Sequence, residues 1–430
     1  MDPASDFALG NGMRFIVAPD HAVPAAAFGV WTRAGVCDEP PERRGIAHYF
    51  EHMMFRGSER FGPKEHTAAV ARTGGNCNAY TNFDETVYWE FLPSAELELA
   101  FELEADRFRR LRLEADGAAT EKKVVLEELR VYENQPMTRA LRRLLRALGG
   151  EHPYALDPLG RTEDLGAVSV EDLAAWWRRL YRPGNVFAVA SGDVNVERVR
   201  ELAEKHFGDW RDPEGLTPPT PPPRFLPAVG RRAERVSVEV PLAVRLHRLP
   251  PSAELDSPAL ELLVALLADG ESSPVRETLV KKTRLCVHAG AQSFRLLHGG
   301  ALVFFGAFLP PGSHRPRHQA LAAICDRLAA EGPEAGQFEV RLRRFRRDRA
   351  AESYSCRRRL EGLGEAELRE GGYARYERAL QDLAAVTPER VQDLARRLFA
   401  PENTLELDVV PERTRWWMPL AGLFARFIPR

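Results

Sequence analysis

The apolar and polar residues of this chain recur with the two periods that are typical of strands and helices. Short runs rich in apolar and β-branched residues predict strands, and residues with helical spacing predict amphipathic helices with solvated charged faces. Gly74 and Gly75 allow the tight turn before a hairpin. The predicted strands are 13–17, 25–31, 76–81 and 86–92, and the predicted helices are 45–55, 95–110, 120–132 and one through 139–145. This mixture predicts an α+β fold, with a mostly antiparallel sheet covered by helices.

The sequence also repeats itself at a distance of about 218 residues. Phe91-Leu92-Pro93 recurs as Phe308-Leu309-Pro310. The residues Val168, Glu171, Arg178, Arg179, Leu180, Pro183 and Asn185 recur as Val386, Glu389, Arg396, Arg397, Leu398, Pro401 and Asn403, each shifted by 218. Such self-similarity predicts two homologous α/β domains within one chain.

The length of 430 residues is ample for two domains that each have a core of their own. A proline-rich run at 218–223 is stiff and extended, as expected of a linker. We therefore expect a catalytic N-terminal domain at 1–212, a linker at 213–227, a repeat domain at 228–412 and a tail at 413–430.

The predicted helix at 45–55 contains candidate metal ligands. His48 and His52 lie four residues apart, so their imidazoles share one face of the helix. Glu51 is close enough to take a proton from a metal-bound water without occupying a metal position. This His-x-x-Glu-His order is the inverted motif of zinc hydrolases. The alternative is an amphipathic core helix with two satisfied histidines.

A site with two histidines needs a third protein ligand. The helix at 120–132 offers Glu127 and Glu128, and their helical neighbours differ. Glu128 lies three or four residues from Val124, Val125, Val131 and Tyr132, a predicted buried stripe where a carboxylate is costly unless it is paired or bound to metal, whereas Glu127 lies beside Lys123 and Arg130. We therefore predict Glu128 as the third ligand. Glu121, two turns earlier, is predicted to steady the site, or else is a helix N-terminal acid favoured by the macrodipole.

Several separated motifs together resemble a known family. They are the run from Gly45 to Gly57, the separation of 128 − 52 = 76 positions between His52 and Glu128, Asn78-Ala79-Tyr80-Thr81, and Asp84-Glu85-Thr86-Val87-Tyr88. This chain resembles the pitrilysin (M16) family of zinc peptidases, and within it the group of mitochondrial processing peptidase. The likeness runs from Leu9 to Asn185 and, more weakly, to the C-terminus. It implies one Zn²⁺ per chain and a peptide substrate.

In the family that the chain resembles, the strand with the Asn-Ala-x-Thr pattern binds the peptide as an added edge strand. Carried over, Asn78 and Ala79 would face the scissile region. Main-chain hydrogen bonds at a sheet edge suit a peptidase of broad specificity. The alternative is that Asn78 caps the turn after the glycines.

The second half does not duplicate the metal site. Aligning Gly270 with Gly57 places Glu261, Val264 and Ala265 opposite the three motif residues. Family members that act alone or as homodimers carry an Arg and a Tyr seven positions apart in this half, where our alignment puts Val280 and Val287. The resemblance therefore implies the metal-bearing chain of a heterodimer whose related partner supplies that pair. A register error of a residue or two would instead leave a homodimer open.

Composition excludes some classes of function. A net charge of −2 with 28 % charged residues gives no basic footprint for nucleic acid. Five widely spaced cysteines without a Cys-x-x-Cys motif, and no signal peptide or apolar span, indicate reduced thiols and a cytoplasmic protein. The aromatic and basic tail at 413–430 either packs on its own domain or makes a peripheral contact with a membrane or a partner.

The sequence thus predicts a zinc endopeptidase that cuts peptides or unfolded protein segments. The rival from another class is a non-catalytic structural or assembly subunit of the same fold. Subunits of that kind tend to have broken motifs, whereas this chain keeps every predicted metal ligand and the base.

Overall fold

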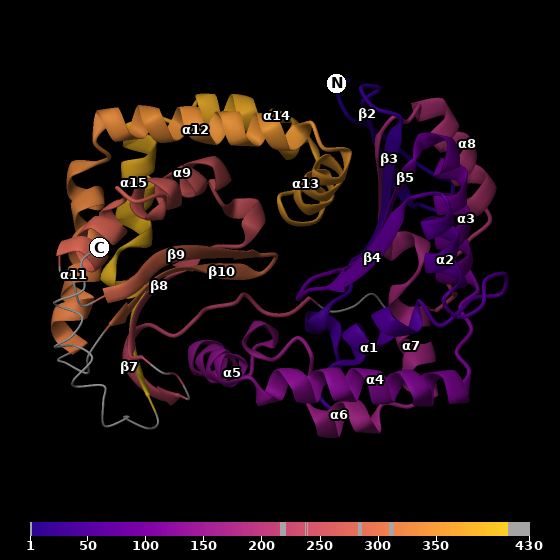
Figure 1. The fold of residues 1–430 in the computed structure, drawn as a ribbon, viewed down its shortest axis with the longest axis horizontal. Helices are drawn as coiled ribbons and strands as arrows, with labels where there is room; N and C mark the ends of the chain where they lie inside the picture. The colour runs from indigo at the N-terminus through magenta and orange to yellow at the C-terminus, as the bar shows by residue number, and fades with distance from the viewer. Residues whose placement is uncertain are drawn as a thin grey trace. The chain divides into compact units, whose positions relative to one another are not determined.

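The computed structural model describes residues 2–215, 221–236, 238, 240–282, 286–308 and 314–411 (Figure 1). The chain forms two compact units. The first contains Met1–Tyr132, Leu156–Pro222 and Ala350–Arg378, and the second contains Glu133–Ala155, Pro223–Arg349 and the residues from Ala379 onward. Each unit combines one sheet with helices, so the predicted α+β fold with two similar halves is confirmed.

The first unit is built on a six-stranded sheet in the order β1-β2-β6-β3-β5-β4. All neighbours are antiparallel except β2 and β6. β3 is central and buried on both faces, whereas β4 is an edge strand with polar, partly exposed residues. The strands are β1 (Ser5–Ala8), β2 (Arg14–Pro19), β3 (Ala25–Thr32), β4 (Asn76–Thr81), β5 (Thr86–Pro93) and β6 (Val186–Gly192).

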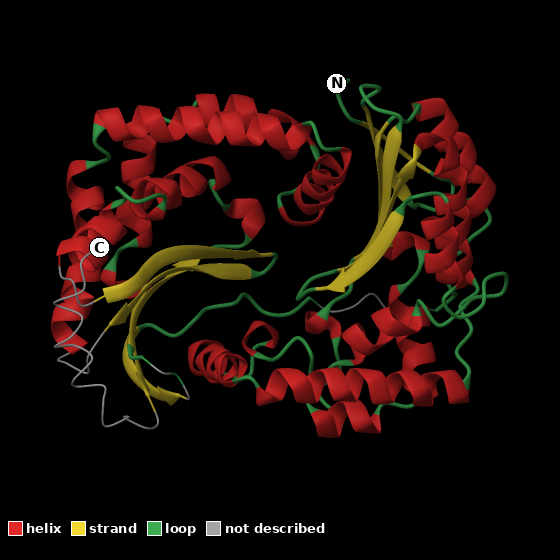
Figure 2. Cartoon of the chain, in the orientation of Figure 1, coloured by secondary structure: helices red, strands yellow, loops and turns green. Residues whose placement is uncertain are grey.

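Helices cover one face of this sheet and enclose its main core (Figure 2). Aromatic rings join the layers: the centroids of Phe28 on β3 and Phe101 on α3 are 4.1 Å apart. Trp176 on α7 is buried in the same core. The helices are α1 (Ile46–Met53), α2 (Glu65–Arg72), α3 (Leu97–Arg109), α4 (Ala115–Asn134), α6 (Thr162–Ala167), α7 (Val170–Leu180) and α8 (Val196–Phe207).

The opposite face of the sheet is covered by α13 (Cys356–Arg369), which comes from the second half of the sequence (Figure 1). Leu360 and Leu363 of this helix pack against Trp31 and neighbouring sheet residues. The approach is so close that a Cβ at Gly364 would lie 2.2 Å from the Trp31 ring. The first unit therefore extends beyond the contiguous range 1–212 expected from the sequence.

The second unit repeats the topology, with a five-stranded sheet in the order β7-β11-β8-β10-β9. This order matches β2-β6-β3-β5-β4 strand for strand, and β7 and β11 are its parallel pair. The strands are β7 (Gly230–Val236), β8 (Leu242–Leu249), β9 (Cys286–Leu296), β10 (Gly299–Phe308) and β11 (Thr404–Pro411). The helices are α5 (Pro136–Gly149), α9 (Ser257–Ala268), α10 (Pro274–Arg276), a π-helix (Glu277–Lys282), α11 (His314–Glu331), α12 (Ala335–Ser353), α14 (Ala374–Ala384) and α15 (Pro388–Leu398).

The helix exchange is reciprocal, because α5 from the first half of the sequence packs on the sheet of the second unit. Leu144 and Leu148 of α5 contact the core around β7, β8 and β11. The boundaries expected from sequence therefore differ from the observed units at 133–155 and 350–378. An amphipathic pattern indicates that a helix has an apolar face, but not which sheet that face covers.

Each half has an ion pair at the corresponding place, but the acidic and basic residues are exchanged between the two pairs. Arg43, before α1, donates to Asp172 on α7 at 2.8 Å. Asp256, before α9, accepts two hydrogen bonds of 2.7 Å from Arg390 on α15. Asp256 lies 213 positions after Arg43, the same shift as from Gly57 to Gly270. The structure thus supports the alignment that sets α9 against the motif helix.

The predicted strands and helices agree with the structure to within a few residues, apart from helix 120–132, which begins earlier as α4. None of the described helices has both the length and the apolar character of a membrane span. No disulfide joins any two of the five cysteines, all of which are described. Part of the predicted linker, at 216–220, and the tail at 413–430 lie outside the described residues.

Candidate metal centre

The motif helix α1 is fixed at its N-terminus by a buried glutamate. Gly45 precedes the helix with φ 94°, and a Cβ there would lie 2.7 Å from the Leu159 carbonyl oxygen. Glycine has no side chain to cap the helix, so Glu39 supplies both acceptors: the N–H groups of Gly45 and Ala47 donate to its carboxylate at 3.0 Å each. Burial raises the pKa of Glu39 to about 8, against the opposing effect of these hydrogen bonds.

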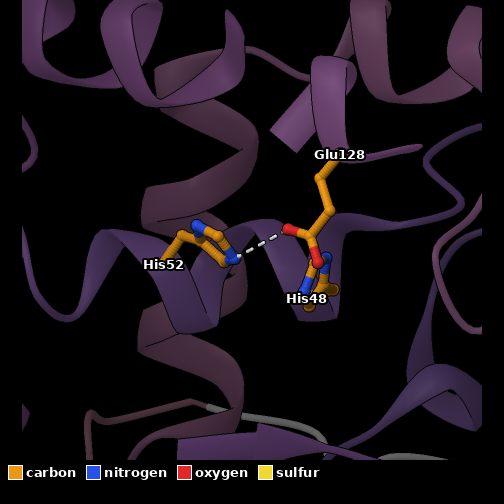
Figure 3. A group of neighbouring side chains, drawn as sticks. All are labelled: His48, His52 and Glu128. Carbon is orange, nitrogen blue, oxygen red and sulfur yellow. Dashed lines mark ion pairs between the residues drawn. The ribbon is translucent and has the colours of Figure 1, made fainter. Parts of the chain in front are cut away.

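Three predicted ligands come together between α1 and α4 (Figure 3). One ligand atom each from His48, His52 and Glu128 lies within 4.8 Å of the other two. The His48 and His52 ring centroids are 4.7 Å apart, and His52 Nε2 is 3.6 Å from Glu128 Oε2. The Tyr49 hydroxyl donates to the Ala118 carbonyl at 2.6 Å and thereby joins the two helices.

The donor set fits a zinc ion. His48 Nδ1 is buried without a hydrogen-bond partner among the described residues. Burial, assisted by the nearby His52, lowers the pKa of His48 to about 4, so its ring is neutral and has a lone pair to donate. Two imidazoles and one carboxylate form a ligand set of catalytic zinc sites, which leave one position open.

Glu121 orients the second imidazole. Its Oε1 is 2.9 Å from His52 Nδ1, which leaves Nε2 directed toward Glu128. When a ligand histidine donates a hydrogen bond to a carboxylate from the ring nitrogen that does not face the metal, its tautomer is fixed and the other nitrogen becomes a stronger metal ligand. Burial lowers the pKa of His52, but the hydrogen bond to Glu121 and the neighbouring carboxylates outweigh it and raise the pKa. Glu121 is held in turn by Arg56 at 3.6 Å.

Glu51 lies on α1 as well, and its carboxylate accepts a hydrogen bond from the edge strand β4. The Thr81 hydroxyl donates to Glu51 Oε2 at 2.7 Å. Burial raises the pKa of Glu51, and the hydrogen bond from Thr81 opposes this effect. A carboxylate with a raised pKa beside a metal cluster is suited to accept and release a proton.

The structure places Glu128, and not Glu127, beside the two histidines, although only part of the stripe predicted from the sequence is buried. Glu127 is exposed and pairs with Arg130 at 3.2 Å, away from the histidines. Val124 and Val131, expected beside Glu128 on a buried stripe, are 50 % and 54 % exposed. The expectation is right for Val125 and wrong for Val124 and Val131, because α4 is buried along the stripe of Ala118, Val125 and Leu129.

The predicted substrate strand lies at the open edge of the sheet. Ala79 packs on the core that contains α1, whereas Tyr80 packs on the core that contains α13. Side chains alternate along a strand, so Asn78 shares the face of Tyr80, opposite Ala79. The Asn78 side chain accepts from the Ala79 N–H at 2.9 Å. Asn78 and Ala79 therefore both present their backbones at the edge of the sheet, whereas their side chains point to opposite faces.

Sequence reasoning missed three residues that position this site: Glu39, Tyr49 and Thr81. Glu39 precedes the helix by several residues of loop, and nothing in a sequence pattern directs it back to the helix start. Thr81 is part of the recognised Asn-Ala-x-Thr pattern, so its place in a motif was a usable signal for that residue.

A second buried cluster contains His66, Glu90 and Glu104, whose ligand atoms also lie within 4.8 Å of one another. Arg107 already neutralises it: its Nε donates to Glu104 at 2.8 Å, and Nη2 lies 3.5 Å from Glu90. Burial raises the pKa of Glu90 well above its usual value. A guanidinium that stays protonated repels a divalent cation, so this cluster is suited to hold a proton rather than a metal.

The second unit has no counterpart of the metal centre among its described residues. Glu261 occupies the position of His48 but is 2.9 Å from Arg295 in an ion pair. Val280 is buried on the π-helix, and Val287 is 40 % exposed at the start of the edge strand β9. Neither side chain can donate a hydrogen bond. Arg284, which lies between them, is outside the described residues.

The fold and the site define a class: repeated α+β proteins in which one half carries an inverted His-x-x-Glu-His helix. Comparison with protein families gives two adjoining matches. The model described as "Insulinase (Peptidase family M16)" matches residues 14–160, and "Peptidase M16 inactive domain" matches residues 167–344. The chain belongs to the M16 peptidase family. The match to an inactive domain agrees with the finding that the described residues of the second unit form no cluster of metal ligands.

Relatives cover nearly the whole chain. An uncharacterized zinc protease of Mycobacterium tuberculosis is 28 % identical over 414 residues, which cover 93 % of this chain and 92 % of that protein. The crystal structure of a protease from Helicobacter pylori has a TM-score of 0.86 at 24 % identity and covers 96 % of this chain and 100 % of that one. The periplasmic protease PqqL from Escherichia coli has a TM-score of 0.76 at 17 % identity. This match covers 97 % of this chain but only 49 % of PqqL.

Proposed function

We propose that this chain is a zinc-dependent endopeptidase that cleaves peptides or unfolded protein segments. The observation that carries the proposal is the convergence of His48, His52 and Glu128 beside Glu51, with Glu121 behind one of the imidazoles. A scaffold subunit has no need of three metal-ligand groups within 4.8 Å of one another beside a fourth, acidic side chain.

Each residue has a separate role in the proposal. His48, His52 and Glu128 would hold one Zn²⁺, which when bound would lower the pKa of a water molecule to about 7 and polarise the scissile carbonyl. Glu51 takes the proton of the attacking water and delivers it to the leaving amine. The substrate lies along β4 as an added strand, where the backbones of Asn78 and Ala79 bind it.

We further propose that a second, related chain completes the substrate site. Val280 and Val287 cannot supply the hydrogen-bond donors that the family resemblance leads us to expect, so a partner has to provide an Arg and a Tyr. PqqL supports this arrangement, since its chain is about twice as long as this one and so has room for two such halves. If the chain is active alone, a homodimer replaces this heterodimer.

The test of the catalytic role is Glu51→Gln, which removes the base but leaves the ligands. We expect this variant to keep stoichiometric zinc by metal analysis and to lose turnover of a quenched, unstructured peptide. Glu127→Gln, on the exposed side of α4, is the control and should match the wild type. Cleavage is assayed with and without a zinc chelator, for the chain alone and with candidate partner chains. Undiminished cleavage by Glu51→Gln would refute the role of the base.

The rival function, a structural or assembly subunit, predicts a different outcome in the same preparation. It requires neither zinc in the purified chain nor chelator-sensitive cleavage with any partner. A chain that holds zinc and yet cleaves nothing alone would direct the search to the partner.

A further inference from the structure

One hydrogen bond joins the predicted base to the predicted substrate strand. Thr81 is the last residue of β4, the open edge of the first sheet, and its hydroxyl is 2.7 Å from Glu51 Oε2. Glu51 belongs to α1, so this contact links two elements that are separated by α2 and its flanking loops. Among the described residues, none donates a hydrogen bond to the other carboxylate oxygen, Oε1.

The direction of this hydrogen bond is fixed by the next strand. Thr86 on β5 is the ladder partner of Thr81, and their hydroxyl oxygens are 3.4 Å apart. Thr86 donates its only hydroxyl proton to the Ala34 carbonyl at 2.9 Å. The Thr81 hydroxyl proton is therefore available to Glu51 Oε2 at 2.7 Å, since the other nearby oxygen, of Thr86, is 3.4 Å away.

We propose that Thr81 is a positioning residue that holds Oε2 of Glu51 and so leaves Oε1 for the attacking water. The inference rests on the proposed peptidase function, in which Glu51 is the base. It adds a coupling: because Thr81 ends the strand to which the peptide is added, a properly seated peptide also steadies the base. The described contacts of the Thr81 hydroxyl are with Glu51 and Thr86, neither of which is a predicted metal ligand, so Thr81 acts through Glu51.

A merely structural tie between β4 and α1 would give a different kinetic result. Loss of a tie would loosen the edge strand and raise KM, whereas loss of positioning lowers kcat. A hydrogen bond to a charged group corresponds to roughly a 10- to 100-fold effect on rate. The distinguishing measurement is therefore the division of the effect between kcat and KM.

The kinetic experiment compares Thr81→Val with Thr81→Ser, using the quenched peptide and the zinc-loaded chain with whatever partner it needs. We expect Thr81→Val to lower kcat about 10-fold or more, with KM within about threefold of the wild type, while Thr81→Ser restores kcat. Thr73→Val is the control, because the Thr73 hydroxyl bonds only its own helix, at the Val70 carbonyl. An active wild type with an unchanged kcat in Thr81→Val overturns the inference.

A second readout needs no activity. In the metal-free chain, Thr81→Val leaves the Glu51 carboxylate without its donor, so the melting temperature should fall by several degrees. In a Glu51→Ala background the same change should have no such effect, because the acceptor is gone. If Thr81→Val lowers the melting temperature equally in both backgrounds, the Thr81 hydroxyl does not act through Glu51 and the inference is refuted. A wild type that never cleaves, but still shows this coupling, instead overturns the proposed function.

Discussion

Replacing Glu39 with Ala should destabilise the first unit by removing the support of the motif helix. Two buried N–H groups, of Gly45 and Ala47, lose their acceptor, and neither can turn to water. Each lost hydrogen bond costs about 1 kcal/mol, and burial of unpaired donors adds to the cost, so the total is about 3 kcal/mol. For a unit of this size that corresponds to a melting temperature lower by roughly 6–12 °C.

The assay is thermal unfolding of the metal-free chain by circular dichroism, followed by zinc competition with a chelator. Because His48 lies in the first turn of α1, a frayed helix start should also weaken zinc binding. Glu42→Ala is the control, since the exposed Glu42 side chain makes no described contact. A melting temperature for Glu39→Ala within 2 °C of that control would refute the reasoning.

The pH dependence of Glu39 gives a second measurement on the same residue. Burial raises its pKa in the folded state to about 8, above the value of 4.5 expected when unfolded. The folded state therefore binds this proton more tightly, so the contribution to stability is full below pH 4.5 and is lost as the pH rises through about 8. Glu39→Gln cannot titrate and should lose this part of the pH dependence.

The remaining predictions concern zinc and the division of the chain. Glu128→Gln should weaken zinc binding by roughly 100-fold or more, whereas Glu127→Gln should not change it; equal affinities in a chelator competition would refute the assignment of the third ligand. His66→Ala should still bind one zinc per chain by metal analysis, because Arg107 excludes a cation from that cluster; a loss of zinc would contradict this. A fragment of residues 1–215 should aggregate on purification, because it lacks α13; a soluble fragment with a sharp melting transition would show that the exchanged helix is dispensable.

Sequence patterns predicted the ligand candidates because the signals for them are local. His48 and His52 share a helix face by spacing alone, and the strands beside them are strongly apolar. Patterns on one helix also ranked Glu128 above Glu127 but misjudged Val124 and Val131. Helical periodicity indicates which residues share a stripe, whereas packing decides which of two adjacent apolar stripes is covered.

The contacts that orient the site were out of reach for a different reason. Glu39 and Thr81 act on α1 from a loop and from a strand, so their roles depend on tertiary proximity that no spacing rule encodes. Glu121 lies between residues that spacing alone can identify and residues whose role only the tertiary structure shows. Its spacing from Glu128 marked it as a candidate on α4, but only the 2.9 Å contact with His52 Nδ1 distinguishes a supporting acid from a helix N-terminal charge.

The exchange of α5 and α13 predicts that two halves that look separable in sequence do not fold independently of each other. The sheet of the first unit presents Trp31, Trp89 and Phe187 on the face away from the metal site. Leu360, Leu363 and Leu368 of α13, from the second half, pack on those side chains. Burial of aromatic side chains is worth about 1.5–3 kcal/mol each, comparable to much of the net stability of a domain. We therefore expect the candidate metal centre to depend on residues beyond 350, although all of its predicted ligands lie before residue 130.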